Sequence, residues 1–499
     1  MAQDSQLSRR NLSIIIFVVT LFIVVLYNLP GSRKPGTVEP GPIVMPDPVL
    51  AEDVKEGEPV LTSLGLIEQS EPKAHRIHIE SWKTPNGAKV LFVKANEIPM
   101  LDVRVVFDAG GARDDKLPGL ANLTSAMLTE GAGIADVDTI ARHFEGLGAS
   151  LNTSSYRDMA VASLRTLSDP QFREPALSLF YDVVAQPTFP ESSLERLKAQ
   201  MMLSLQREKQ SPGAIAQKTF FDELYGAANH PYGIHTKGTE DSLGLISTLD
   251  LQQFHQKYYV ASNMVVAMIG DIERSDAELI ALQLDKQLPQ GTPAPKLPKP
   301  AALESAKQAH VEFPSSQTHI LVGGVGIARG NPDHYALAVG NEILGAGGFS
   351  SRLNKIIRQE NGLAYSVYSH FTPMSVAGPF SINLQTRNDQ SQQAITLLNS
   401  TLSDFIQNGP TKQELSDAKR HLLGSFPLQT ASNGNIVSYL GMIGFYDLPK
   451  DYLEQYPAKI EDVSIKDIKK AFQKAVNSSA LLTVTVGGSS NNPAQPAPQ

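Results

Sequence analysis

The sequence predicts an α+β fold of two homologous domains in tandem, preceded by an N-terminal transmembrane helix. Its 499 residues, of which 41% are hydrophobic and 19% charged, suffice for two or more globular domains with cores of their own. A proline-rich segment divides the chain past its middle, and the same order of strand-like and helix-like patterns occurs on both sides of it. These observations together favour a duplicated architecture.

The N-terminal segment predicts a membrane anchor. Residues 12–29 are 18 mostly apolar residues, a length just sufficient to cross a bilayer, with Arg9 and Arg10 before them. Because a cleavable signal peptide has a shorter apolar region and a small-residue cleavage site, we favour an uncleaved signal anchor behind a short cytoplasmic stub, together residues 1–29. The leading arginines and the absence of a second apolar span predict a single-span protein of a bacterial inner membrane, with its body in the periplasm.

Three further segments lack sustained periodicity. Residues 30–75 are rich in proline, glycine and acidic residues, and they predict a flexible tether. Residues 288–300 hold five prolines in 13 residues, which excludes both a helix and a central strand, so we interpret residues 288–305 as a linker. Residues 489–499 are of low complexity and predict a disordered tail. The two domains are therefore expected at residues 76–287 and 306–488.

Both halves begin and end with the same patterns. Alternating apolar residues predict strands at 89–93 and 101–107 in the first half and at 319–325 in the second, each followed by a helix rich in leucine and alanine. Each half closes with a charged helix that runs into an apolar strand and a glycine. These closing segments, 251–271 and 468–488, align without gaps at an offset of 217 residues and share four identical positions. Internal duplication is the architecture that this pattern indicates.

Composition excludes several classes of function. The formal net charge is −8 and no run of lysine and arginine occurs, so nucleic acid is not expected as a partner. The chain has no cysteine, which excludes disulfides, thiolate metal sites and a cysteine nucleophile.

The segment GLANLTSAMLTEGAG, residues 119–133, predicts a helix that begins after Pro118 and ends at a glycine-rich exit. At helical spacing it carries two stripes. One is apolar (Leu120, Leu123 and Met127), and the other is small and weakly polar (Asn122, Ser125, Ala126 and Thr129). The second stripe is open to three interpretations: a site, a packing face, or a site whose chemistry has been removed.

Three longer segments carry a resemblance to a known family. Residues 107–133, 229–233 and 341–369 resemble the insulinase or pitrilysin family of zinc peptidases, and the resemblance extends from about residue 78 to 488. It implies two similar domains that face each other across a peptide-binding chamber. It also implies that the substrates are short or unfolded peptides.

The same resemblance implies that the zinc site is vacated here. In catalytic members the first helix carries His-x-x-Glu-His, because two histidines four apart reach one zinc and the glutamate activates its water. The matching positions are Asn122, Ser125 and Ala126, none of which can perform that chemistry.

A third zinc ligand, a glutamate, would be expected at residues 202–204 of a later helix, 194–210. Methionine and small residues stand there, and Glu208 lies a turn or more beyond them. His230 and His235 are five apart across a Pro-Gly turn, and we interpret His230 as a packing or hydrogen-bonded loop residue. We therefore expect no zinc in this chain.

The second half keeps a pair that the first half lacks. Arg358 and Tyr365 match the arginine and tyrosine that, in the family, hydrogen-bond the scissile region of a substrate. A guanidinium and a phenol can both donate to a developing oxyanion. The alternative is that Arg358 is a surface cation and Tyr365 packs at a domain edge.

The first hypothesis for function is a membrane-tethered, zinc-free subunit that pairs with a zinc-bearing homologue as a heterodimer and supplies substrate-binding residues for peptide hydrolysis. The chain would then not be catalytic alone, and the zinc would lie in the partner chain. The alternative is a non-proteolytic peptide-binding or scaffold protein of the cell envelope, in which residues 147–158 offer a strand edge to an extended peptide. An active peptidase with unorthodox zinc ligands is a third, less favoured possibility.

Overall fold

The computed structural model describes residues 77–226 and 230–488. The predicted anchor at residues 12–29, the tether at 30–75 and the tail at 489–499 lie outside the described residues. Within the part that is described, no helix combines the length and the apolar character needed to cross a membrane.

The first half is built on a six-stranded sheet in the order β1-β2-β8-β3-β7-β6. Its strands are β1 (Glu80–Lys83), β2 (Lys89–Lys94), β3 (Met100–Phe107), β6 (Ser150–Ser155), β7 (Ala160–Leu167) and β8 (Met264–Gly270), with a small β4 (Gly131–Ala132) and β5 (Ala135–Asp136) pair beside it. Its α-helices are α2 (Leu120–Met127), α3 (Val137–Gly146), α4 (Pro170–Ala185), α5 (Glu191–Glu208), α6 (Pro212–Tyr225), α7 (Glu240–Leu245), α8 (Thr248–Tyr258) and α9 (Arg274–Gln287). Short 3₁₀ turns are η1 (Gly111–Arg113), η2 (Pro231–Gly233) and η3 (Ala261–Asn263).

The second half is built on a five-stranded sheet in the order β11-β12-β10-β13-β9. Its strands are β9 (Lys307–Glu312), β10 (Gln317–Val325), β11 (Val367–Phe371), β12 (Pro379–Arg387) and β13 (Leu482–Gly487). Its α-helices are α10 (His334–Asn341), α11 (Ser391–Asn408), α12 (Lys412–Gln429), α13 (Asn433–Phe445), α14 (Tyr452–Glu461) and α15 (Ile465–Ala475). Two π-helical segments, η4 (Glu342–Ala346) and η6 (Asn354–Glu360), flank the 3₁₀ turn η5 (Gly348–Ser350), and η7 (Asn388–Gln390) follows β12.

The two sheets share one topology, which confirms the duplication. In each, the central strand (β3 or β10) is antiparallel to both neighbours, and the closing strand (β8 or β13) is parallel to the next one (β2 or β9). The closing helices also correspond, since α8 begins at residue 248 and α15 at residue 465, an offset of 217 residues that holds at their ends as well. The weak sequence identity of the closing segments therefore reflects equivalent structure.

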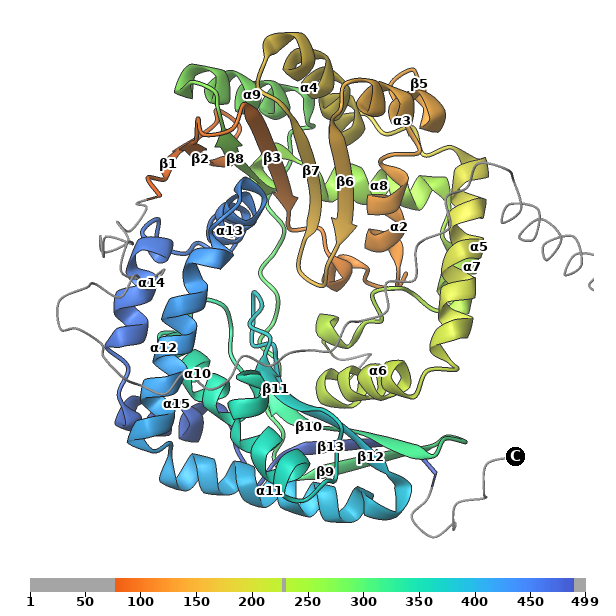
Figure 1. Ribbon diagram of the computed structural model, residues 1–499. Helices are drawn as coiled ribbons and strands as arrows, with labels where there is room; N and C mark the ends of the chain where they lie inside the picture. Colours follow the sequence, from red (N-terminus) through yellow and green to blue (C-terminus); the bar gives the residue numbers. More distant parts are fainter. Residues whose placement is uncertain (1–76, 227–229, 489–499) are drawn as a thin grey trace, which may run out of the picture. The chain divides into compact units, whose positions relative to one another are not determined.

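One feature was not anticipated from the sequence: each half covers the sheet of the other with a helix. Helix α13, from the second half, packs on β8, β3 and β2, whereas α6, from the first half, packs on β13 and β10 (Figure 1). The apolar layers beneath these helices accordingly mix residues of both halves, for example Val265 with Leu440, and Phe220 with Val484. Because a helix of the other half covers one face of each sheet, the two halves form one compact body.

Glycines allow α13 to approach its sheet closely. A Cβ atom at Gly444 would lie 2.5 Å from Val265 Cγ1 and 2.6 Å from Leu91 Cδ1, and one at Gly441 would lie 3.2 Å from Val106 Cγ2. Since real Cβ atoms do not approach other atoms to 2.5 Å, a larger residue at Gly444 would force the helix off the sheet.

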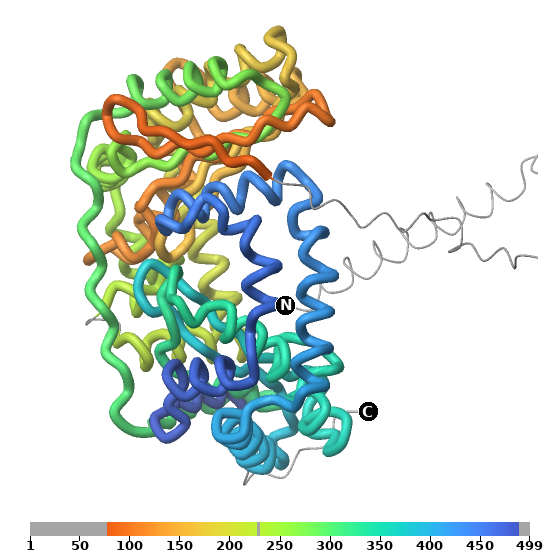
Figure 2. Tube along the Cα trace, turned by 90° about the vertical axis from the view of Figure 1, so that its left-hand side faces the viewer, coloured from red at the N-terminus to blue at the C-terminus, as the bar shows by residue number. Residues whose placement is uncertain are grey.

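The two halves are joined by a segment without regular structure. Residues 288–306 contain no helix or strand and run extended from α9 to β9, as Figure 2 shows in green. The side-chain amide of Asn263 fixes this segment, because its Oδ1 accepts from the Ala294 N–H at 3.0 Å.

Candidate functional site

Helix α2 carries the positions of the expected zinc motif. It spans Leu120–Met127, so it begins after Pro118-Gly119 as predicted and ends before the predicted glycine-rich exit, where Gly131–Ala132 pairs as a strand. Its apolar stripe is buried as expected, since Leu120, Leu123 and Met127 all belong to the core of the first half. The helix therefore has one face fixed in the core and presents the other toward β6 and α5.

A buried carboxylate fixes the N-terminus of α2. Asp114 accepts hydrogen bonds from the backbone N–H groups of Gly119 and Ala121, both at 2.7 Å. These bonds occupy donors that a helix N-terminus leaves without an intrahelical partner. Burial raises the pKa of Asp114 to about 8, against the lowering effect of these two bonds and of Arg157. The start of the helix is therefore held in place by a side chain six residues before it.

The three motif positions do not fit a zinc ion. Asn122 and Ala126 are half-buried, and Ser125 is buried with only 1% of its surface exposed. The Ser125 Oγ has no hydrogen-bond partner among the described residues. An amide, a hydroxyl and a methyl group lack the imidazole and carboxylate donors that zinc prefers, so the motif positions supply no zinc ligand and no general base.

Helix α5 does not supply the missing ligand. It packs against α2, and Arg196 on α5 forms an ion pair with Glu130 just after α2. Met202 lies against the core of the first half. Glu208 forms an ion pair with Lys237, and its second oxygen lies 3.7 Å from His235 Nε2. Throughout residues 77–226 and 230–488, no group of three or more His, Asp or Glu side chains could hold a metal ion.

Strand β6 lies beside α2 at the end of its sheet. It follows β7 in the strand order, and no strand of the described part of the chain pairs with its other side. Ser150, Asn152 and Ser154 are exposed along it, and their alternation is that of a strand with one face toward solvent. The edge expected within residues 147–158 is therefore present.

Arg358 and Tyr365 come together in the second half. Arg358 lies in η6, Tyr365 lies just before β11, and the guanidinium carbon is 5.0 Å from the centre of the Tyr365 ring. Gly362, between them, has a φ of +62°, a conformation that glycine adopts without strain and that turns the chain back. The tyrosine side chain does not pack at a domain edge, because 83% of its surface is exposed. The role of the pair in binding substrate stays a prediction.

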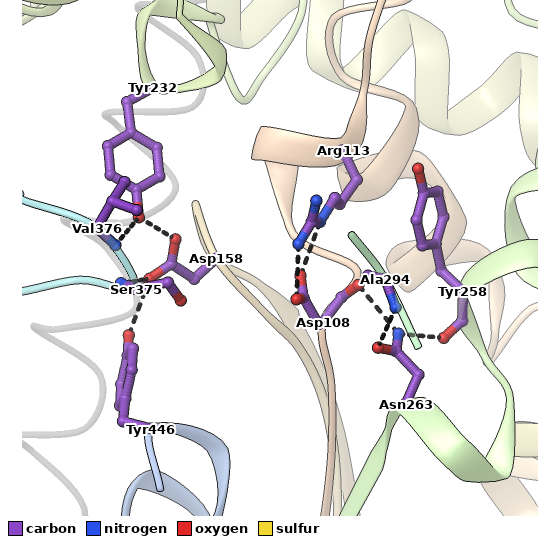
Figure 3. Close-up of polar contacts among 10 residues, drawn as sticks. All are labelled: Asp108, Arg113, Asp158, Tyr232, Tyr258, Asn263, Ala294, Ser375, Val376 and Tyr446. Carbon is purple, nitrogen blue, oxygen red and sulfur yellow. Dashed lines mark hydrogen bonds and ion pairs between the residues drawn. The ribbon is translucent and has the colours of Figure 1, made fainter. Parts of the chain in front are cut away.

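A second buried carboxylate joins the two halves (Figure 3). Asp158, at the turn between β6 and β7, accepts from Tyr232 Oη at 2.6 Å, from the Ser375 N–H at 2.7 Å and from Tyr446 Oη at 3.1 Å. The Tyr232 hydroxyl also accepts from the Val376 N–H at 3.2 Å. Ser375 and Val376 precede β12, and Tyr446 follows α13, so Asp158 connects the edge of the first sheet to two segments of the second half.

The end of β3 is fixed beside this cluster, as Figure 3 also shows. Arg113 holds Asp108 through two hydrogen bonds, of 2.7 and 2.6 Å. Burial raises the pKa of Asp108, although Arg113 opposes the rise. The side-chain amide of Asn263 donates to the carbonyl oxygens of Asp108 and Tyr258 at 3.1 and 2.8 Å. Because Asn263 also binds Ala294 of the segment that joins the halves, it connects that segment to the end of β3.

His230 is a loop histidine, as predicted. Its Nδ1 accepts from the Tyr232 N–H at 3.0 Å, so its Nε2 carries the proton and donates to the Pro298 carbonyl at 2.9 Å. The residue is buried between Tyr225 and Tyr232 and links the loop to the segment that joins the halves. Among the described residues it belongs to no group of side chains that could hold a metal ion.

Sequence reasoning missed Asp158 and Phe349. Phe349 is exposed, and its ring centre lies 4.6 Å from the guanidinium carbon of Arg358. Asp158 ends the segment 147–158 and Phe349 lies within 341–369, but neither belongs to a periodic pattern or to a spacing that binds a ligand. An aromatic residue in a polar, glycine-rich stretch was the one available indication for Phe349.

Two family models match the chain. The one described as Insulinase (Peptidase family M16) matches residues 89–240, and the one described as Peptidase M16 inactive domain matches residues 246–422. The first match contains α2 and β6, and the second contains Arg358 and Tyr365.

Three known proteins are similar to this chain over most of their own length. A crystal structure of a peptidase M16 inactive domain from Pseudomonas fluorescens superposes with a TM-score of 0.80 and 46% identity, covering 83% of this chain and 98% of that one. The non-peptidase homolog YmxG of Helicobacter pylori is 28% identical over 77% of this chain and 88% of its own. The mitochondrial-processing peptidase subunit beta of Blastocladiella emersonii is 23% identical over 81% of this chain and 88% of its own.

Proposed function

Because the chain belongs to the insulinase family, peptidase family M16, and lacks the residues that bind zinc in its catalytic members, we propose that it is a non-catalytic subunit of a peptidase. It pairs with a zinc-bearing homologue, and it contributes Arg358 and Tyr365 to the binding of a peptide substrate. The chain itself performs no hydrolysis.

The contact between Arg358 and Tyr365 carries this proposal. The two side chains are seven residues apart, and the fold brings the guanidinium to the exposed phenol ring at 5.0 Å. Together they offer N–H and O–H donors to a peptide carbonyl. The first half, in contrast, keeps helix α2 in place, but the motif positions Asn122, Ser125 and Ala126 carry no group that could activate water. A chain with only the substrate-binding half of the chemistry needs a partner with the other half.

The similar proteins support both parts of the proposal. One is called a non-peptidase homolog, which agrees with a chain that lacks catalytic residues. Another is called a subunit of a processing peptidase, which agrees with function in an assembly.

The test is reconstitution with the zinc-bearing homologue that copurifies from native membranes. The pair should cleave an unfolded peptide, and zinc should be found in the partner only. Arg358→Ala should lower kcat/KM by about tenfold or more, and Tyr365→Phe should lower it by a smaller factor, because each removes a donor to the substrate. Arg387→Ala, which removes an exposed arginine paired with Asp389, is the control. Equal cleavage by all three variants would refute the role of the pair.

Strand β6 favours a second candidate, a peptide-binding or scaffold protein without proteolysis. An edge strand can bind an extended peptide through its backbone groups alone. A solitary, zinc-free chain that binds unfolded peptides tightly would support this candidate, whereas strict copurification with a zinc-bearing homologue would count against it.

The cellular location is part of the proposal. The apolar residues 12–29 act as a single inner-membrane anchor, with the body in the periplasm. A reporter that is active only in the periplasm, fused after residue 488, should then be active, and the protein should stay in the membrane fraction after a high-salt wash. An inactive reporter or a salt-extracted protein would contradict this location.

A further inference from the structure

Phe349 stands next to Arg358 in an exposed surface patch, which we define as Phe349, Arg358 and Tyr365. The exposed fractions of the two rings are 69% for Phe349 and 83% for Tyr365. The guanidinium carbon of Arg358 lies 4.6 Å from the first ring centre and 5.0 Å from the second. Exposing a large aromatic ring to water is unfavourable in free energy. Two such rings around one cation are therefore unexpected on a surface that binds nothing.

Among the described residues the side chain of Arg358 has no polar partner, unlike those of Arg352, Arg387 and Arg420 in the same half. Within residues 77–226 and 230–488 it forms no ion pair, and its N–H groups donate no hydrogen bond. Arg352, six residues earlier, is paired with Glu414 and Asp404, and Arg387 is paired with Asp389. The five N–H donors of Arg358 are therefore available to a ligand.

Hydrogen bonds from side chains to backbone carbonyl oxygens hold the loop of Phe349 beside Arg358. The Gln359 side-chain amide donates to the Phe349 carbonyl oxygen at 2.7 Å, which ties the loop to η6, the segment that carries Arg358. Ser350 and Ser351 close the same loop through bonds to the carbonyl oxygens of Gly347 and Gly348. Both neighbouring segments, η4 and η6, are π-helical. This conformation is rare in proteins as a whole, but where it occurs it is often at a functional site.

We infer that the patch is a carboxylate-binding site for peptides, in which the Phe349 ring fixes the guanidinium of Arg358. An arginine whose position is fixed by aromatic rings offers its planar N–H edge to both oxygens of a carboxylate. The ring surfaces then contact the apolar part of the same peptide. This inference rests on the proposed role of Arg358 in peptide binding and adds the chemical class that it selects. Phe349 is a positioning residue, because it acts through Arg358.

The test uses three fluorescein-labelled heptapeptides with the full-length chain. They share one apolar sequence and end in a free carboxylate, in a carboxamide, or in a carboxamide with one glutamate side chain near the end. Fluorescence anisotropy gives the three dissociation constants. We expect at least one carboxylate peptide to bind about tenfold more tightly than the neutral peptide, because charge-assisted bidentate bonds are lost with the carboxylate. The two charged peptides distinguish a terminal from a side-chain carboxylate.

Variants assign the effect to the patch. Arg358→Gln should abolish the preference for carboxylate, and Arg358→Lys should retain part of it. Phe349→Leu should reduce the preference about twofold to fivefold without changing the affinity for the neutral peptide, and Phe349→Tyr should restore it. Arg387→Gln is the matched control and should change nothing. A variant that merely disturbed the fold would weaken all three peptides alike.

Two results would overturn the inference: equal binding of charged and neutral peptides, including no binding of either, or a preference that survives in Arg358→Gln. The proposed function fails separately, when the reconstituted pair cleaves equally well with Arg358→Ala.

Discussion

Replacing Asp158 by asparagine should destabilise the whole folded body by about 3–5 kcal/mol. The change keeps the shape of the side chain but removes its charge. The two bonds from Ser375 and Tyr446 to Oδ2 become neutral bonds, each weaker by about 1 kcal/mol. The new NH₂ group would face the Tyr232 hydroxyl, which now donates to Oδ1, and the phenol proton would lose its acceptor at a cost of about 1–3 kcal/mol.

The assay is urea unfolding of the full-length chain, followed by two probes. The single tryptophan of the chain, Trp82, lies on β1 of the first half, under the guanidinium of Arg274 at 3.5 Å, so its fluorescence reports on that half. Far-UV circular dichroism reports on both halves. Because α6 and α13 are exchanged, the two transitions of the wild type should coincide, and Asp158→Asn should lower both midpoints together.

A double-mutant cycle with Tyr446→Phe isolates the bond across the halves. Tyr446→Phe should cost about 1 kcal/mol in the wild type and less in the Asp158→Asn background. Asp389→Asn, an exposed aspartate paired only with its neighbour Arg387, is the control and should leave the midpoint unchanged. The reasoning is refuted if Asp158→Asn unfolds like the wild type, or if the fluorescence transition of the wild type separates from the circular-dichroism transition.

Two further predictions concern packing and pH. Gly444→Val should lower the free energy of unfolding by about 1–3 kcal/mol, because its Cβ would lie 2.5 Å from Val265 Cγ1. Gly424→Ala in α12, where a Cβ would meet no neighbouring atom within 4 Å, should raise it by up to about 1 kcal/mol. Equal urea midpoints for the two variants would contradict this. Burial lowers the pKa of His255 to about 4, so the folded state keeps this histidine neutral while the unfolded chain takes up a proton below its ordinary pKa of about 6.5. The stability that comes from the neutral ring is present above pH 6.5 and is lost as the pH falls toward 4. The melting temperature of the wild type should therefore exceed that of His255→Gln by less and less across that window. A constant difference would show that His255 does not titrate there.

Many strands and helices could be predicted from the sequence, because the alternation and spacing of apolar residues are local features. The strands at 89–93, 101–107 and 319–325 were recognised from alternation, and each lies within an observed strand. The start of α2 and its exit at Gly131–Ala132 agree with the prediction, whereas the end of the helix at Met127 and the pairing of the exit with β5 were not foreseen, because strand pairing depends on residues that helical periodicity does not include. The buried stripe of α2 was right, since helical spacing alone determines which side chains share a face.

Only part of the candidate site could be predicted from the sequence. The vacated positions Asn122, Ser125 and Ala126 were identified by resemblance, and side-chain chemistry alone shows that they cannot bind zinc. The contact of Phe349 with Arg358 was not foreseen, because it depends on a loop conformation set by Gln359 and on the π-helical turn of η6. No spacing rule describes such a turn, since it is neither α-helical nor extended.

The sequence by itself determined the duplicated order of elements, because local spacing shows it, and through its resemblance to the insulinase family it implied the loss of the zinc ligands in α2 and the retention of the Arg358 and Tyr365 pair. Only the tertiary structure decided that α6 and α13 each cover the sheet of the other half, and that Asp158 binds Tyr232, Ser375 and Tyr446 across the two halves. An amphipathic helix has an apolar face that fits either sheet, and its own sequence does not say which one. Long-range packing and the requirement to pair buried polar groups make that choice.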